Sequence, residues 1–194
     1  NLTYLPVAGD VIGFDTGPGN MLMNAWTERH LQQPFDAGGE WASSGQVIPE
    51  LLSNLLAHSY FSLPAPKSTG RDLFNLSWLQ EYLQPAYLAE DVERTLLELT
   101  AASIANAILK DSAPCEAIYV CGGGAFNTLL VQCLQARLSP INVFTTDSLG
   151  LNVSLVEATA FAWLAKQCLE RQPGNLPKVT GAKDYRTLGA IYYN

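Results

Sequence analysis

Gly13-Phe14-Asp15-Thr16-Gly17-Pro18-Gly19-Asn20 is the stretch that decides the fold of this 194-residue chain. Apolar residues lead into Asp15 as a buried strand, and the glycines and proline that follow require a sharp turn. Helical periodicity begins at Met21, and Asn20 can cap that helix. The stretch therefore presents a carboxylate at a strand-to-helix junction. There it can act as a general base, and the loop amides and the helix N-terminus can face an anion.

The periodicity of apolar residues predicts alternating strands and helices along the chain. The expected strands are residues 2–7, 11–15, 117–121, 141–145 and 187–192. The expected helices are residues 21–32, 47–56, 76–83, 91–109, 127–138 and 155–169. Gly9-Asp10 is a turn dipeptide, so the first two strands should form a hairpin. This order predicts an α/β fold with a central sheet flanked by helices.

Three consecutive glycines, Gly122, Gly123 and Gly124, form a second candidate site between a strand and the helix that begins near Asn127. Glycines without a Cβ allow nucleotide phosphates or a sugar ring to lie against the main chain, next to the positive end of a helix. A tight strand-to-helix turn with no ligand is the alternative. The spacing matches neither GxGxxG nor GxxxxGK[ST], which excludes the common dinucleotide and P-loop motifs.

Glu157 stands in an otherwise apolar helix, where a carboxylate could hold Mg²⁺, position a water molecule, or simply stabilise the first helical turn. The loop Pro66–Arg71 carries two cations and two hydroxyls, which suits an anion or a sugar as well as an exposed loop. His30 and His58 stand alone, without metal-ligand spacing, and receive no role.

The composition narrows the class of partner. A net charge of -7 and a pI near 4.7 disfavour binding to nucleic acid or to anionic lipid, which leaves a small molecule as the expected ligand. No apolar run is long enough for a membrane span, and no leader pattern is visible. The four cysteines lack CxxC spacing and are expected to be small buried side chains in a reducing cytoplasm. The chain begins without a methionine and looks cut from a longer protein.

Several long motifs together resemble one family, the anhydro-N-acetylmuramic acid kinases. The motifs follow the family's order over essentially the whole chain. They are residues 13–23, 39–42, 66–71 with 74–75, 121–127, 157–165 and 175–182. Two positions depart from the family pattern. Asn24 stands where an aspartate is usual, and Ser154 stands where an acidic residue is common.

The resemblance implies one lobe of an actin and sugar-kinase type ATPase fold, with ATP and sugar meeting between two similar lobes. Residues 1–194 would be the C-terminal lobe. The N-terminal lobe, with its first phosphate loop of the type Gly-Thr-Ser-x-Asp-Gly, has no counterpart in these residues. The implied reaction opens 1,6-anhydro-N-acetylmuramic acid with water and phosphorylates the freed O6 from ATP. The implied product is N-acetylmuramic acid 6-phosphate, in the recycling of cell-wall peptidoglycan.

The resemblance also implies residue roles. Asp15 would be the general base that deprotonates the attacking water, and Glu157 would hold water or Mg²⁺ near the phosphates. The remaining implied positions bind the nucleotide: Thr16 and Gly17 in the phosphate region, Gly122, Gly123 and Gly124 along the nucleotide, and Asn127 at the helix start beside them.

Two other functions compete with a complete kinase. Without the other lobe, the chain alone could be an inactive lobe that binds nucleotide weakly or mediates formation of a homodimer, because catalysis in such clefts needs groups from both sides. An aspartic protease also uses an apolar-apolar-Asp-Thr-Gly pattern. In those proteases the motif continues into β-structure, whereas here Gly17-Pro18-Gly19 leads into a helix.

Overall fold

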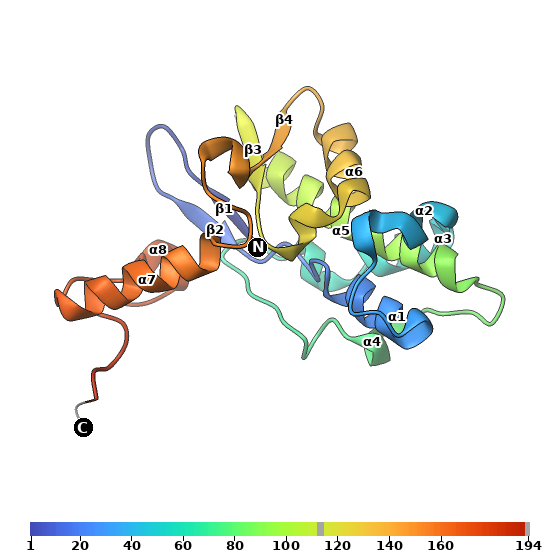
Figure 1. Cartoon of the computed structure of the whole chain (residues 1–194), viewed down its shortest axis with the longest axis horizontal. Helices are drawn as coiled ribbons and strands as arrows, with labels where there is room; N and C mark the ends of the chain where they lie inside the picture. The colour runs from blue at the N-terminus through green and yellow to red at the C-terminus, as the bar shows by residue number, and fades with distance from the viewer. Residues whose placement is uncertain (112–114, 193–194) are drawn as a thin grey trace.

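The computed structural model describes residues 1–111 and 115–192 (Figure 1). Its strands are β1 (Leu2–Tyr4), β2 (Ile12–Phe14), β3 (Ala117–Val120) and β4 (Asn142–Thr145). Its α-helices are α1 (Met21–Leu31), α2 (Glu40–Ser44), α3 (Pro49–Leu56), α4 (Leu76–Gln80), α5 (Ala89–Asp111), α6 (Thr128–Leu138), α7 (Val156–Leu169) and α8 (Pro177–Thr180). Four short 3-10 helices complete the described elements: η1 (Ala37–Gly39), η2 (Ser59–Ser62), η3 (Gly123–Phe126) and η4 (Thr146–Leu149).

Helix α5 is the centre of the hydrophobic core. It spans 23 residues, and its buried side chains include Leu96, Leu97 and Leu99. Helices α1, α2, α3 and α6 all pack against it. Small residues such as Ala101 and Ala105 allow this close approach. The predicted long helix over residues 91–109 is confirmed, and the structure extends it at both ends.

The strands form two separate small sheets. Strands β1 and β2 pair antiparallel, with Leu2 opposite Phe14, which confirms the predicted hairpin. Strands β3 and β4 pair parallel, with Ala117 opposite Asn142, across the connecting helix α6. The expected single central sheet is therefore wrong for the described residues. The periodicity of apolar residues identifies each pair of strands, but it does not indicate whether the two pairs join in one sheet.

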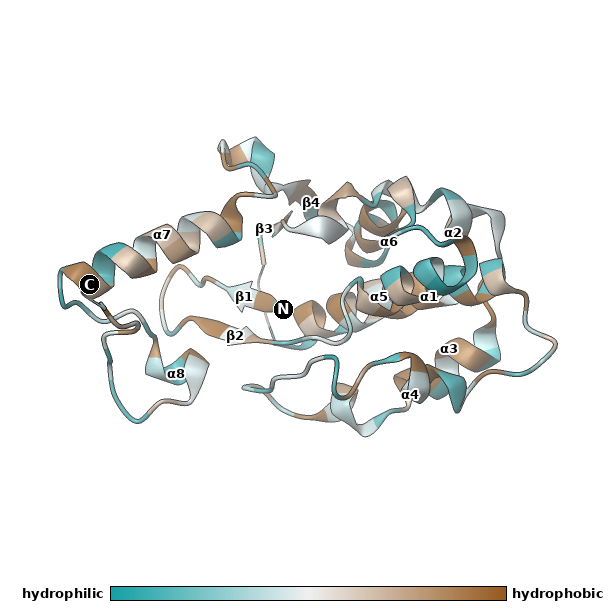
Figure 2. Cartoon of the chain, turned by 60° about the horizontal axis from the view of Figure 1, so that its bottom comes forward, coloured by the Kyte–Doolittle hydropathy of each residue, from teal (hydrophilic) through white to brown (hydrophobic). Residues whose placement is uncertain are grey.

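The C-terminal part of the chain lies apart from the helical core. Helices α7 and α8 extend to one side of the molecule, away from α1 to α5 (Figures 1 and 2). The predicted strand over residues 187–192 does not form. Instead this segment returns along α7, where Leu188 lies against Gly174 and Gly189 lies against Cys168. Without a strand edge beside it, an extended apolar segment has no partner for its backbone hydrogen bonds.

All four cysteines are free, and none of them is buried. Cys121 is exposed, while Cys115, Cys133 and Cys168 are half-buried. The expectation that they are buried is therefore wrong: Cys115 and Cys121 flank β3, and Cys133 and Cys168 lie on partly exposed faces of α6 and α7. Within residues 1–111 and 115–192, no helix is both long and apolar enough to cross a membrane.

Candidate functional site

Asp15 lies directly after β2, and its backbone is fixed from two sides. Its amide donates a hydrogen bond to the carbonyl oxygen of Lys67 at 3.0 Å. Its own carbonyl oxygen accepts a hydrogen bond from the Tyr60 hydroxyl at 2.8 Å. Burial and the charge of Asp15 raise the pKa of Tyr60 to about 12, so this phenol remains a donor at neutral pH. These contacts hold the end of the strand in one position.

The Asp15 carboxylate is held by the loop that follows Pro66. The Ser68 hydroxyl and the Thr69 amide both donate to Oδ2, at 2.8 and 3.0 Å. Within the described part of the chain, Oδ1 receives no hydrogen bond and can accept a proton from a bound molecule. The loop Pro66–Arg71, considered above for anion or sugar binding, thus contacts the carboxylate itself.

The turn after Asp15 forms as the sequence indicates. Gly19 adopts a positive φ of 59°, which favours glycine, and the Met21 amide donates to the Pro18 carbonyl oxygen at 3.3 Å. The Thr100 hydroxyl of α5 donates to the Gly19 carbonyl oxygen at 2.7 Å. The Asn20 side chain makes no capping hydrogen bond to α1, so that part of the prediction is wrong.

The side chain of Asn20 instead lies beside the triple-glycine loop. A Cβ added to Gly123 would meet the Asn20 Nδ2 atom at 3.3 Å. Gly122 has a φ of 78° and donates its amide to the Val153 carbonyl oxygen at 2.9 Å. Asn127 caps α6, since its Oδ1 accepts from the Leu130 amide at 3.0 Å. The structure thus brings together two glycine-rich turns that are about a hundred residues apart in the sequence.

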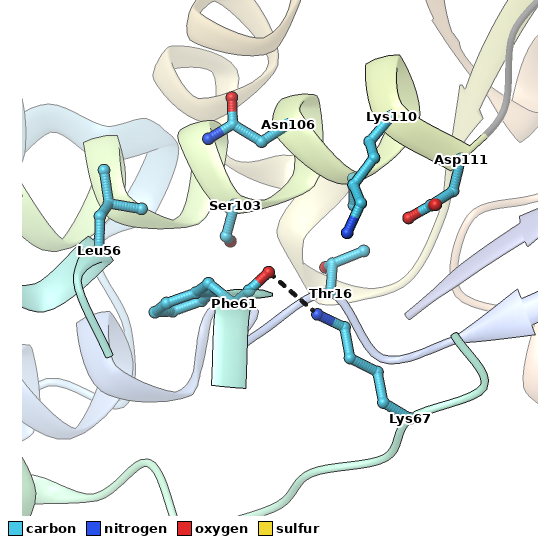
Figure 3. A pocket seen from close by; sticks show the side chains of 9 residues that line it. Thr16, Leu56, Phe61, Lys67, Ser103, Asn106, Lys110 and Asp111 are labelled. Carbon is cyan, nitrogen blue, oxygen red and sulfur yellow. Dashed lines mark hydrogen bonds between the residues drawn. The ribbon is translucent and has the colours of Figure 1, made fainter. Parts of the chain in front are cut away.

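A cavity of about 110 Å³ lies behind Thr16, between α5 and the Lys67 loop (Figure 3). The Lys67 and Lys110 side chains enter it from opposite sides. The Lys67 ammonium donates to the carbonyl oxygens of Tyr60 and Phe61, at 3.0 and 3.4 Å. Burial, followed by the charge of Lys110, lowers the pKa of Lys67. Because pockets for small molecules occupy about 300 to 1,000 Å³, this cavity suits water or a small anionic group but not a whole nucleotide.

Glu157 lies in the first turn of α7 and is exposed. No hydrogen bond or ion pair connects its carboxylate to Asp15, to the glycine loop or to any other described residue. An acidic residue in the first turn interacts favourably with the helix dipole. It stabilises the helix in this way without a second side chain as a partner. The structure therefore places the turn that begins with Asp15, Thr16 and Gly17 next to the glycine loop through Asn20, and it leaves Glu157 outside that group.

The described residues contain no group of three side chains with the spacing of a metal site. Mg²⁺ does not require such a group, because it commonly keeps several waters and binds through one or two carboxylates and the phosphates of its substrate. The side chain of Asp15 is compatible with that mode of binding, and so is the exposed side chain of Glu157.

A buried acid on α5 was not predicted from the sequence. Glu93 is fully buried, and burial raises the pKa of its carboxyl group to about 8. The Thr27 hydroxyl donates to its Oε1 at 3.2 Å, while Oε2 has no partner among the described residues. The nearby Asp36 raises this pKa further. Only the position of Glu93 on the most buried helix could have indicated this environment.

A family model and individual known proteins match this chain along its length. A sequence model of the family described as "Anhydro-N-acetylmuramic acid kinase" matches residues 1–194. Among proteins with that name, one from Nitrosomonas europaea is 53% identical over 192 residues, which cover 99% of this chain and 53% of the relative. One from Coxiella burnetii is 48% identical over 196 residues, covering 100% of this chain and 53% of the relative. One from Saccharophagus degradans is 49% identical over 195 residues, covering 99% and 52%.

The chain thus spans about half the length of the curated relatives it matches. The family model, in contrast, covers every residue of the chain, and the matched residues include both glycine-rich turns and the segment that holds the Asp15 carboxylate. This chain belongs to the anhydro-N-acetylmuramic acid kinase family.

Proposed function

We propose that this chain is the C-terminal lobe of a two-lobed, ATP-dependent kinase of the actin and sugar-kinase type. The full-length enzyme would convert 1,6-anhydro-N-acetylmuramic acid to N-acetylmuramic acid 6-phosphate during peptidoglycan recycling. The observation that carries this proposal is the held carboxylate of Asp15 beside two apposed glycine turns, in a chain that matches the family along its length. The half-length match to the relatives supports the assignment to one lobe.

Asp15 would act as the general base of the reaction. Its Oδ1 would take a proton from water as the water oxygen attacks C1 of the anhydro sugar and the bond between C1 and O6 breaks. The freed O6 then attacks the γ-phosphorus of ATP, and ADP leaves. Two hydrogen bonds to Oδ2 support this role, because they fix the orientation of the carboxylate. Thr16 and Gly17 would line the phosphate region next to it.

The triple-glycine loop would face the adenine nucleotide. Gly122, Gly123 and Gly124 leave the main chain open to a ligand, and Asn127 fixes the start of α6 beside them. Mg²⁺ would neutralise phosphate charge when bound. Asp15 or Glu157 could contribute a carboxylate to it, or a water-mediated contact, with the remaining positions filled by phosphate oxygens and water.

The mechanism can be tested with a chimaera in which this chain replaces the matched half of the Nitrosomonas europaea relative, here called the completed chimaera. We expect it to phosphorylate 1,6-anhydro-N-acetylmuramic acid, and we expect Asp15→Asn to lower its turnover by at least about a hundredfold, the usual contribution of a general base. Asp10→Asn is the matched control, because Asp10 is exposed and pairs only with Lys178 at the surface. Near-normal turnover of the Asp15→Asn chimaera would exclude Asp15 as the base.

The 194-residue chain alone should show no kinase activity, because half of the cleft would be absent. Nucleotide binding to the chain, followed by calorimetry, would separate an inactive binding lobe from one that has lost the nucleotide site altogether. Phosphorylation of the anhydro sugar by the isolated chain would contradict the assignment of this chain to one lobe of two.

A further inference from the structure

Helix α7 is apolar and almost entirely uncovered. It contains 14 residues, of which none is buried. Leu155, immediately before it, is 54% exposed, and Phe161 and Leu169 are each 70% exposed. Isolated exposed apolar residues are common on protein surfaces, but a whole apolar helix indicates a surface that is covered in the assembled protein.

Five of the exposed apolar residues follow a regular spacing, while Phe161 and Trp163 are exposed outside this series. Leu155, Ala158, Ala162, Ala165 and Leu169 are separated by three, four, three and four positions, which places them along one side of the helix. We call these five residues the α7 stripe. All five are exposed. Three- and four-residue spacing is the pattern of a seam between two helices, and the central alanines would allow the two backbones to approach closely.

The other side of α7 already has a partner within the chain. Leu164 of α7 and Leu188 of the C-terminal segment both lie against Gly174, and the Gln167 amide donates to the Pro173 carbonyl oxygen at 3.1 Å. The returning C-terminal segment therefore covers the side of the helix opposite the stripe. The stripe is therefore exposed on a helix that has contacts of its own on the opposite side.

We propose that the α7 stripe is a docking surface for a helix from the half of the family polypeptide that this chain does not contain. The proposal rests on the two-lobed organisation proposed above. The length of the relatives identifies the occupant of this surface. This chain matches 53% of the Nitrosomonas europaea relative, so the unmatched part of that protein must pack against other parts of the polypeptide. A second copy of this chain is the competing occupant, and the test separates the two.

The test measures the accessibility of one stripe position. In a background with the native cysteines replaced by serine, Ala162→Cys is introduced into both the isolated chain and the completed chimaera, and its reaction with a thiol reagent is timed. Ala160→Cys is the matched control, since Ala160 is also exposed on α7 but lies outside the stripe. Circular dichroism checks that each variant retains its helix content.

We expect the reaction at position 162 to be at least about tenfold slower in the chimaera than in the isolated chain, with a much smaller change at position 160, because a packed helix face reacts only when it opens. Equal rates at position 162 in the two proteins would overturn the proposal. Protection in the isolated chain that grows with its concentration would also overturn it, in favour of a second copy.

This outcome is independent of the proposed reaction. A chimaera that is inactive but protected at position 162 would keep the docking surface and count against the function. An active chimaera without protection would keep the function and remove the docking surface.

Discussion

Helices α5 and α7 are both rich in apolar and small residues, yet the two have opposite surroundings. Helix α5 contributes twelve buried residues to the core, whereas α7 contributes none. Four helices pack around α5, while α7 is covered on one side only, by the returning C-terminal segment. Apolar composition thus indicates that a helix tends to be buried, but burial occurs only where the chain supplies a partner for that helix.

The greatest change in stability is expected at Phe74, and Phe161 provides the comparison from the region of α7. Phe74 is fully buried, with its ring 5.0 Å from that of Trp78, whereas Phe161 is 70% exposed. We expect Phe74→Ala to lower the free energy of unfolding by about 3 to 5 kcal/mol, and Phe161→Ala by less than about 0.5 kcal/mol. Urea unfolding of the isolated chain, followed by circular dichroism, measures both. Similar losses for the two variants would show that the comparison between the two regions is wrong.

The second prediction concerns the buried acid of α5. The pKa of Glu93 is about 8 in the folded protein and near 4.5 when unfolded, so between these values the folded state binds the additional proton. Stability contributed by the protonated group is present below pH 4.5 and is lost as the pH rises through 8. We expect Glu93→Gln to remove up to about 1.4 kcal/mol per pH unit from the slope of stability against pH in this window.

Urea midpoints measured from pH 5 to 8 test this prediction. Glu90→Gln on the same helix provides the control, because Glu90 is only half-buried and its substitution should leave the slope unchanged. If wild type and Glu93→Gln have parallel pH profiles, the Glu93 carboxyl group is not held neutral by burial.

Loss of a single hydrogen bond at the site should have a moderate effect. Tyr60→Phe removes the hydroxyl that donates to the Asp15 carbonyl oxygen while keeping the buried ring. We expect a loss of about 1 kcal/mol in the free energy of unfolding. Tyr82→Phe is a comparison at a half-buried aromatic residue away from the site, and it should cost less. An equal cost for both would mean that the Tyr60 contact contributes no more than an ordinary tyrosine hydroxyl.

The smallest effect is expected where α8 meets the hairpin. Lys178 pairs with Asp10, but both side chains are well exposed. We expect Lys178→Ala to change the free energy of unfolding by about 0 to 0.5 kcal/mol, and less at high salt. Val179→Ala should cost more, because a Cβ on Gly13 would meet Val179 at only 2.8 Å, which shows how closely α8 approaches β2. If Lys178→Ala costs more stability than Val179→Ala, the ion pair and not the apolar contact holds α8 against the hairpin.

Local features of the fold could be predicted from the sequence. The hairpin before Asp15, the long helix α5 and the strand, helix, strand unit after residue 117 all depend on patterns within a few turns of chain. Contacts between distant segments could not be predicted in this way. The division into two sheets, the approach of Asn20 to Gly123 and the exposure of α7 depend on which units meet in space. For the same reason, the environment of Glu93 was not visible in its neighbours along the chain.

The contact between Asn20 and Gly123 also has a consequence for how the protein folds. The turn from Asp15 to Asn20 is contacted by segments near positions 67, 100 and 123, so the site depends on contacts of long sequence separation. Such contacts form slowly, because closing large loops costs entropy before any contact compensates it. During synthesis, the site could not be complete until the triple glycine had left the ribosome. Ligand binding would therefore report late folding events rather than the early formation of α1 or α5.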